Sequence, residues 1–151
     1  MSVLHALFAV ALMGMAVAGG IQYIHPGAMA RNRIAAQADA GFSMVEGAYR
    51  SRQASGAGAP AAASWKEDLF PAFGAPPSEV SGLGWSYGVG AEGAWFCLSG
   101  PLTGPLVQPA LESLAHRRPA GLYDVTSRCG ALGGKPDGSI AATLWMQRAT
   151  P

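Results

Sequence analysis

The feature that most constrains this chain is an uncharged apolar run near its N-terminus, residues 3–24. The run, VLHALFAVALMGMAVAGGIQYI, contains no Asp, Glu, Lys or Arg, and all such residues of the chain follow it, from Arg31 onward. As a helix rising about 1.5 Å per residue the run would be roughly 33 Å long, enough to cross a hydrocarbon core of about 30 Å. The sequence therefore predicts one transmembrane anchor, residues 1–27, followed by a small extracytoplasmic domain.

The run has two interpretations, an uncleaved anchor or a removable signal peptide. Ala16–Ala18 before Gly19 resembles a signal-peptidase site, because small residues precede the cut. The first five residues, however, include no Lys or Arg, and apolar character continues to Ile24. Tyr23 also stands where an interfacial aromatic ring is expected. We therefore expect a permanent anchor, with cleavage between Ala18 and Gly19 as the alternative.

Two observations disagree about which side of the membrane holds the C-terminal part. Arg31 and Arg33 follow the span and no Lys or Arg precedes it, which by the positive-inside rule favours the cytoplasm. The two cysteines, Cys97 and Cys129, instead indicate one disulfide in an exported protein. The aromatic, Gly-rich second half points the same way. We predict a single-pass protein of the bacterial inner membrane with its C-terminal domain in the periplasm.

Beyond the span the chain divides by composition into a helix, a linker and a small domain. Residues 28–53 predict an amphipathic helix, because apolar side chains recur at spacings of three and four. Residues 54–63 are small and predict a linker, and residues 64–151 predict the small α+β domain. The stripe on the helix would form either the domain core or a docking face; it comprises Ile34, Ala38, Phe42 (or Gly41), Val45 and Tyr49.

The sequence of the small domain predicts an antiparallel sheet of three or four strands packed on the amphipathic helix. Residues 85–89 and 94–98 flank a turn with two glycines, which indicates a hairpin. Residues 122–125 predict a short strand, and Ser139–Arg148 predicts the last one. A bridge from Cys97 to Cys129 would hold the loop before the last strand on the sheet.

Two further short helices are expected in this domain. The first begins at Ser64, which with Glu67 matches a capping box, and runs to about Phe70. The second covers about residues 106–117. Its apolar side would consist of Leu111, Leu114 and Ala115.

Enzyme-like motifs occur, but their surroundings do not fit the chemistry. Gly88–Gly93 matches GxGxxG, yet a strand-like segment follows it where a dinucleotide site needs a helix. Gly84–Gly88 matches the nucleophile elbow around Ser86, yet Glu112 and His116 follow only one helical turn apart. The histidines are isolated from other metal-ligating residues. We expect no catalytic residues, no cofactor and no metal.

The layout resembles that of pilins: an uncharged run, an amphipathic helix, a small sheet and a C-terminal cysteine pair. His5 stands where a pilin carries its assembly Glu. The layout resembles more closely the PilM-type protein of type IVb and conjugative thin-pilus operons, with the run at residues 3–24, the polar helix ending in Tyr49-Arg50 and the aromatic, Gly-rich second half. That resemblance implies an uncleaved membrane helix and action through protein–protein contacts.

We therefore expect a non-enzymatic, single-span component of a pilus biogenesis apparatus. A minor pilin or pseudopilin incorporated in the fibre is the first alternative, and a secreted periplasmic enzyme or binding domain is the second. Expected partners are other membrane proteins of the pilus machinery or pilins, with a homo-oligomer as a further alternative. Small residues on the span, including Gly14, Gly19 and Gly20, would permit close helix packing. A net charge of +1 argues against nucleic acid.

Overall fold

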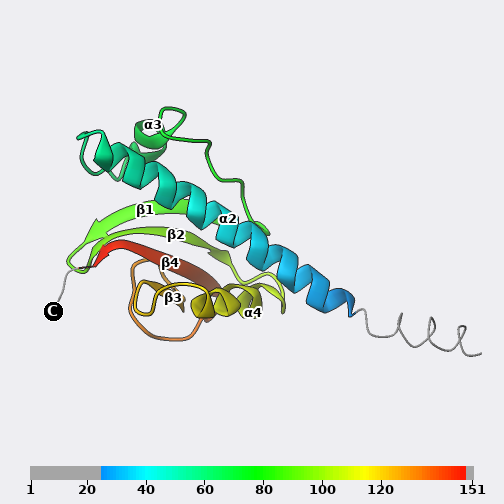
Figure 1. Ribbon diagram of the computed structural model, residues 1–151. Helices are drawn as coiled ribbons and strands as arrows, with labels where there is room; N and C mark the ends of the chain where they lie inside the picture. Colours follow the sequence, from blue (N-terminus) through cyan, green and yellow to red (C-terminus); the bar gives the residue numbers. More distant parts are fainter. Residues whose placement is uncertain (1–24, 149–151) are drawn as a thin grey trace, which may run out of the picture. The chain divides into compact units, whose positions relative to one another are not determined.

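The computed structural model describes residues 25–148, which form an α+β fold with one antiparallel sheet (Figure 1). The chain divides into two compact units, Met1–Ala30 and Arg31–Pro151, and the packing below is that of the second. This confirms the predicted fold class as far as the sheet and its long helix. In chain order the elements are α2 (Pro26–Ala54), α3 (Trp65–Leu69), β1 (Gly84–Gly90), β2 (Gly93–Pro101), α4 (Val107–Glu112), the 3-10 helix η1 (Ser113–His116), β3 (Tyr123–Thr126) and β4 (Ser139–Arg148).

None of the helices within residues 25–148 is long and apolar enough to cross a membrane. The predicted span at residues 3–24 lies outside the described residues, as do His5, Gly14, Gly19 and Gly20.

Helix α2 has the boundaries that its terminal residues favour. Pro26 occupies the first helical position, where its missing N–H breaks no intrahelical bond. The carbonyl of His25 accepts hydrogen bonds from the N–H groups of Ala28 and Met29. Beyond the other end, Gly56 adopts a φ of 79°, which favours glycine, and its N–H bonds to the Gln53 carbonyl. The helix thus covers the predicted range and extends slightly past both ends.

The sheet has the strand order β1-β2-β4-β3, with every pair antiparallel. β1 and β2 form the predicted hairpin, closed at Gly90 opposite Gly93. The last strand has the predicted boundaries, and it lies inside the sheet between β2 and β3. β2 and β4 lose their regular register between Ala94 and Trp95, which marks a β-bulge.

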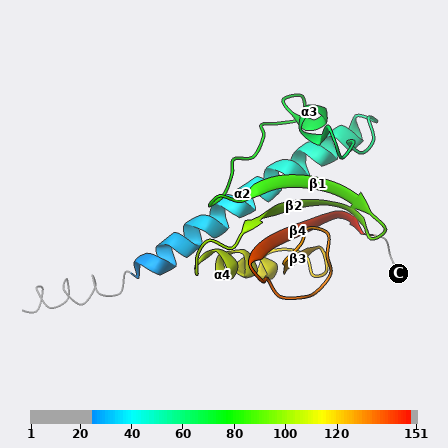
Figure 2. The same cartoon turned by 180° about the vertical axis from the view of Figure 1, so that it is seen from behind.

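Helix α2 lies across one face of this sheet (Figures 1 and 2). Its ring-bearing side chains meet rings of three strands: Phe42 contacts Trp85 and Tyr123, and Tyr49 contacts Phe96. Close approach is possible because Gly41 has no Cβ; a Cβ there would lie 2.3 Å from the Trp85 ring. The buried residues of α2 are Ala35, Ala38, Gly41, Phe42, Val45, Ala48 and Tyr49.

The small helices flank α2 on the same face of the sheet (Figures 1 and 2). Trp65 of α3 packs edge-on against Phe96 of β2, with ring centroids 5.5 Å apart. On the other side, the Tyr123 hydroxyl donates a hydrogen bond to the Leu111 carbonyl of α4. The α2 stripe therefore lies in a core closed by the sheet below and by a short helix on either side.

Two helix predictions need correction. Ser64 makes no capping bond to the backbone; its Oγ donates to Asp68 Oδ2, which also accepts from the Ala61 N–H. The predicted helix at residues 106–117 is an α-helix only to Glu112 and continues as η1. This change of helical type turns Ala115 outward, so it is exposed, whereas Leu111 and Leu114 are buried.

The opposite face of the sheet is covered by the loop between β3 and β4. The predicted disulfide is present: Cys97 of β2 is bonded to Cys129 of the loop, with Cα atoms 5.7 Å apart. The N–H of Gly130 donates to Thr143 Oγ1 of β4. A Cβ at Gly130 would lie 2.6 Å from Trp95 Nε1, so the loop backbone passes directly over that indole. The bridge therefore holds the loop on the sheet, as expected.

Candidate functional site: the Arg118 cluster and its cleft

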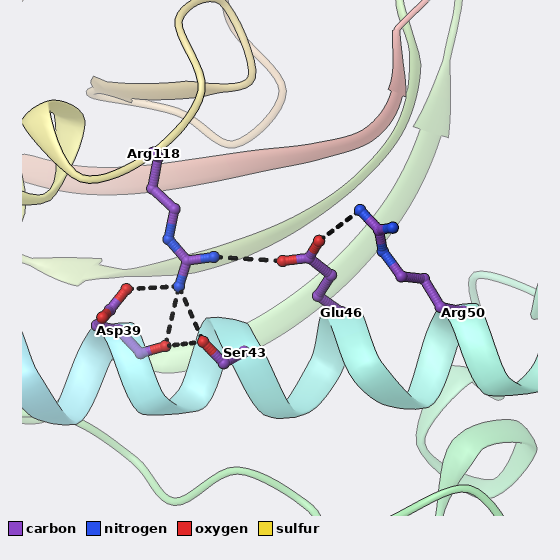
Figure 3. Close-up of polar contacts among 5 residues, drawn as sticks. All are labelled: Asp39, Ser43, Glu46, Arg50 and Arg118. Atoms are coloured by element: carbon purple, nitrogen blue, oxygen red, sulfur yellow. Dashed lines mark hydrogen bonds and ion pairs between the residues drawn. The ribbon is translucent and has the colours of Figure 1, made fainter.

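The most strongly interacting polar cluster among the described residues centres on Arg118 (Figure 3). Arg118 follows η1, and its guanidinium reaches across to α2. Nη2 contacts the Asp39 carboxylate, lies 3.0 Å from the Asp39 carbonyl oxygen and 3.2 Å from Ser43 Oγ. Nη1 lies 3.3 Å from Glu46 Oε2. One side chain thus joins three residues spread over two turns of the helix.

Neighbouring groups hold the α2 side of this cluster in place. Ser43 Oγ donates to the Asp39 carbonyl at 2.9 Å, and the second Glu46 oxygen accepts from Arg50 at 2.7 Å. The Arg118 guanidinium also lies 5.9 Å from the centre of the Phe42 ring, a cation–π distance. The cluster is therefore continuous with the aromatic core beneath it.

Burial divides the cluster into an inner cation and outer anions. The Arg118 side chain is 10% exposed, whereas Asp39 and Glu46 are 35% and 27% exposed. A guanidinium removed from water needs its charge and its donors satisfied by nearby groups. Both carboxylates, a carbonyl and a hydroxyl do this here. In chemical terms the cluster fastens the segment after η1 to α2.

A cleft of about 260 Å³ adjoins the cluster, between α2 and the far end of β4. Glu46, Arg50 and Gln53 line it from α2, and Arg118 lines it from the other side. Tyr49 contributes its hydroxyl, which accepts a hydrogen bond from Gln53 Nε2 at 2.8 Å. The cleft therefore combines charged and uncharged polar groups, and apolar side chains complete its lining: Pro119, Leu122, Leu144, Trp145 and Met146.

The tyrosines next to this region are held in their neutral form. Burial raises the pKa of Tyr49, and the hydrogen bond from Gln53 partly offsets the effect. Burial, with the nearby Tyr49 as the smaller cause, raises the pKa of Tyr87 to about 12. Burial also raises the pKa of Tyr123. Side chains neutral at physiological pH pack in the core without the cost of a buried charge.

We expect Arg118→Ala to lower the free energy of unfolding by roughly 1–3 kcal/mol, measured by urea denaturation. Breaking a fully buried ion pair costs about 3–5 kcal/mol, and the partial exposure of both carboxylates reduces that figure. Arg118→Lys should recover little of the loss, because a point charge cannot reach both carboxylates as the guanidinium fork does.

The matched control is Arg50→Ala, since Arg50 pairs with the same Glu46 but its side chain is 77% exposed. Its expected cost is below about 0.5 kcal/mol. Equal losses of unfolding free energy in Arg118→Ala and Arg50→Ala would contradict the conclusion that the buried arginine contributes more than the exposed one.

The structure settles the two alternatives for the α2 stripe. Phe42, Val45 and Tyr49 are buried against the sheet of their own chain. The prediction that these three form a docking face is therefore wrong, because all three are buried and the rings of Phe42 and Tyr49 pack on rings of the chain's own sheet. The core alternative is the one that the structure contains.

The motif residues that were weighed for catalysis lie apart. Ser86 is half-buried in β1, with its Oγ 3.6 Å from Cys129 Sγ of the disulfide. His116 is exposed at the end of η1. Gly88–Gly93 covers the end of β1 and the turn of the hairpin, with Gly90 opposite Gly93. Within residues 25–148 no three His, Cys, Asp or Glu side chains are grouped so that they could hold a metal ion.

Sequence reasoning missed Arg118, the centre of the cluster. Asp39 and Glu46 lie seven residues apart beside the apolar stripe, so their position on one helix face could have suggested a shared cation. Nothing local identifies that cation, because Arg118 follows Glu46 by 72 residues and Asp39 by 79. Comparison of the chain with protein-family models, curated proteins and solved structures finds no match.

Proposed function

We propose that this chain is a non-enzymatic, single-span subunit of a pilus biogenesis apparatus, with its folded domain in the periplasm. The observation that carries the proposal is the order of segments. The apolar run ends at Ile24, and helix α2, on which the sheet packs, begins at Pro26. A membrane anchor joined almost directly to the central helix of a small domain suits a protein that positions other proteins at a membrane surface.

Two features of the described domain support this proposal. The Cys97–Cys129 disulfide closes a long loop, and such bridges persist mainly in oxidising compartments such as the bacterial periplasm. The cleft beside Arg118 presents charged and polar side chains of two segments to the exterior. Both fit a protein that works outside the cytoplasm through contacts with other proteins.

We expect the full chain, expressed in a piliated bacterium, to remain in the membrane fraction after alkaline carbonate extraction with its N-terminus intact. Leu12→Arg should release much of it, because an arginine at the centre of a span costs about 2.5–3.5 kcal/mol on insertion scales. The matched control is Ala36→Arg, at an exposed position of α2. Its membrane retention should equal that of the unchanged chain.

Three outcomes would count against the proposal. A soluble mature protein beginning at Gly19 would identify the run as a signal peptide. Recovery of the chain in sheared pili at stoichiometric levels would favour a minor pilin. Normal pilus assembly after deletion of the gene would remove the chain from the apparatus, whatever its location.

A further inference from the structure

A row of polar side chains crosses the sheet beneath the loop that joins β3 to β4. Residues that lie directly opposite one another in an antiparallel sheet share a face. In the strand order β1-β2-β4-β3, successive opposite partners form the row Ser86, Cys97, Thr143 and Asp124. Because Cys97 carries the disulfide to the loop, the whole row lies on the face that the loop covers.

The loop follows this row and is attached to it at more than one point. Next to the disulfide, the N–H of Gly130 donates to Thr143 Oγ1 at 3.1 Å. Further along the loop, the N–H of Gly133 donates to Asp124 Oδ2 at 3.0 Å. Opening the bridge at Cys129 therefore leaves noncovalent attachments on the same row, so the bridge can open while the domain is folded.

The two sulfurs of the bridge differ in access from outside. Cys97 is 0% exposed, whereas Cys129 is half-buried. Arg128, next to Cys129 in the chain, is exposed and brings a positive charge, which favours a thiolate. In thiol–disulfide exchange an external thiolate must reach one sulfur, and access governs which one it attacks. Attack on the folded domain is therefore expected at Cys129.

The buried sulfur has a donor for the charge that it would receive. The hydroxyl of Thr143, itself 0% exposed, donates to Cys97 Sγ at 3.8 Å. A hydrogen bond to a charged acceptor is stronger than one to a neutral acceptor, and a stabilised thiolate leaves faster. On the other side of the bridge, Ser86 Oγ lies 3.6 Å from Cys129 Sγ. The accessible sulfur and the sulfur equipped to leave are thus different ones.

We propose that Cys129 is the site at which the folded domain exchanges its disulfide with an external thiol, and that Cys97 is the leaving group. The external thiolate attacks Cys129 Sγ and the bond between the two cysteine sulfurs breaks. Its electron pair stays on Cys97 Sγ, which leaves as a thiolate, and Cys129 is left in a mixed disulfide with the external compound.

A second external thiol completes the exchange. As its thiolate it attacks the external sulfur of the mixed disulfide, which releases Cys129 as a thiolate. Two external thiols have then been oxidised to one disulfide, and the bridge has been reduced to two cysteines. The two protons that the external thiols lose protonate the two cysteine thiolates. This inference does not depend on the proposed pilus function, because it rests on the bridge and the row beneath it.

The test identifies the cysteine that carries the first adduct. The full chain in detergent, with its bridge intact, is mixed with glutathione, quenched with acid at short times and alkylated with N-ethylmaleimide. Trypsin then separates the two cysteines, because Arg128 directly precedes Cys129, and mass spectrometry maps the adducts. We expect at least about tenfold more glutathione on Cys129 than on Cys97, because only one sulfur is accessible.

The matched control is the same chain unfolded in guanidinium chloride, where the two cysteines should carry glutathione equally, to within about twofold. A thioredoxin-type protein with a single remaining cysteine is tested in parallel, and faster reaction at Cys129 than with glutathione would assign a protein thiol as the source. Equal adducts on the two cysteines of the folded chain would overturn the proposal. So would adducts that form only as fast as the chain unfolds, measured by tryptophan fluorescence, or a folded chain that forms no adduct.

Discussion

Replacing both cysteines, in Cys97→Ala/Cys129→Ala, is expected to lower the free energy of unfolding by about 3–4 kcal/mol. The bridge spans 32 residues, and loop-closure arithmetic for that length gives this magnitude. A loss of that size is a large part of the net free energy of unfolding of a small domain. Denaturation in guanidinium chloride, followed by tryptophan fluorescence, measures the loss. Dithiothreitol should have a similar effect on the unchanged chain and none on the variant.

The same variant should change one tryptophan environment before global unfolding. Gly130 lies over the indole of Trp95, and the neighbouring Cys129 is the covalent attachment of that loop to β2. Without the bridge, noncovalent contacts hold the loop, such as the hydrogen bonds from Gly130 N–H to Thr143 and from Ser139 Oγ to the Ser127 carbonyl. These bonds can open and close, so the loop can move away from the indole. We therefore expect a red-shifted emission under native conditions, because water gains access to Trp95.

Ser86→Ala is the control for this variant. Ser86 Oγ touches the disulfide only through a weak contact of 3.6 Å to Cys129 Sγ, so its removal should cost less than about 1 kcal/mol. An unfolding midpoint that the double alanine variant shares with the unchanged chain would show that the bridge does not form in the isolated protein.

Local sequence patterns predicted the parts of the fold that local physics determines. The three-and-four spacing of apolar residues located α2 because a helix repeats every 3.6 residues, and four of its predicted stripe positions are buried. The hairpin was predictable because a turn of this kind needs residues such as Gly90 and Gly93 at fixed places. Ser139–Arg148 was predictable as a run of ten residues free of glycine and proline.

Features that depend on residues far apart in the chain were not predictable in the same way. The stripe on α2 required some covering surface, but its periodicity could not distinguish the chain's own sheet from a partner. The answer depends on rings such as Trp85 and Tyr123, which reach Phe42 only after the sheet has formed. The ion pairs of Arg118 with α2 are equally remote in sequence.

Competition between local hydrogen bonds explains the failed capping prediction. Ser64 and Glu67 have the spacing of a capping box, yet Asp68 offers a carboxylate that accepts from both Ser64 Oγ and the Ala61 N–H. These bonds, led by the one from the Ala61 N–H, lower the pKa of Asp68. A charged acceptor that satisfies two donors is stronger than one neutral capping bond, so the arrangement around Asp68 prevails.

Phe42→Ala is expected to lower the free energy of unfolding by about 3–5 kcal/mol, the usual range for removing a fully buried aromatic side chain. The ring meets Trp85 at 4.8 Å and 80° and Tyr123 at 5.6 Å and 87°. Each such edge-to-face pair contributes about 0.5–1.5 kcal/mol beyond the buried area. The substitution therefore weakens the attachment of α2 to β1 and to β3 together.

Two comparisons in urea denaturation separate this packing from general effects on the helix. Met44→Ala, two residues along α2 at a side chain that is 43% exposed, should change the free energy of unfolding by less than about 0.5 kcal/mol. A double-mutant cycle of Phe42→Leu with Tyr123→Leu should give a coupling energy of about 0.5–1.5 kcal/mol, because only the pair of rings makes the edge-to-face contact. A loss below about 1 kcal/mol in Phe42→Ala, or a coupling energy near zero, would mean that α2 does not rest on the sheet through this ring. The Arg118 guanidinium would then lack the aromatic surface beneath it, because it lies over the same ring.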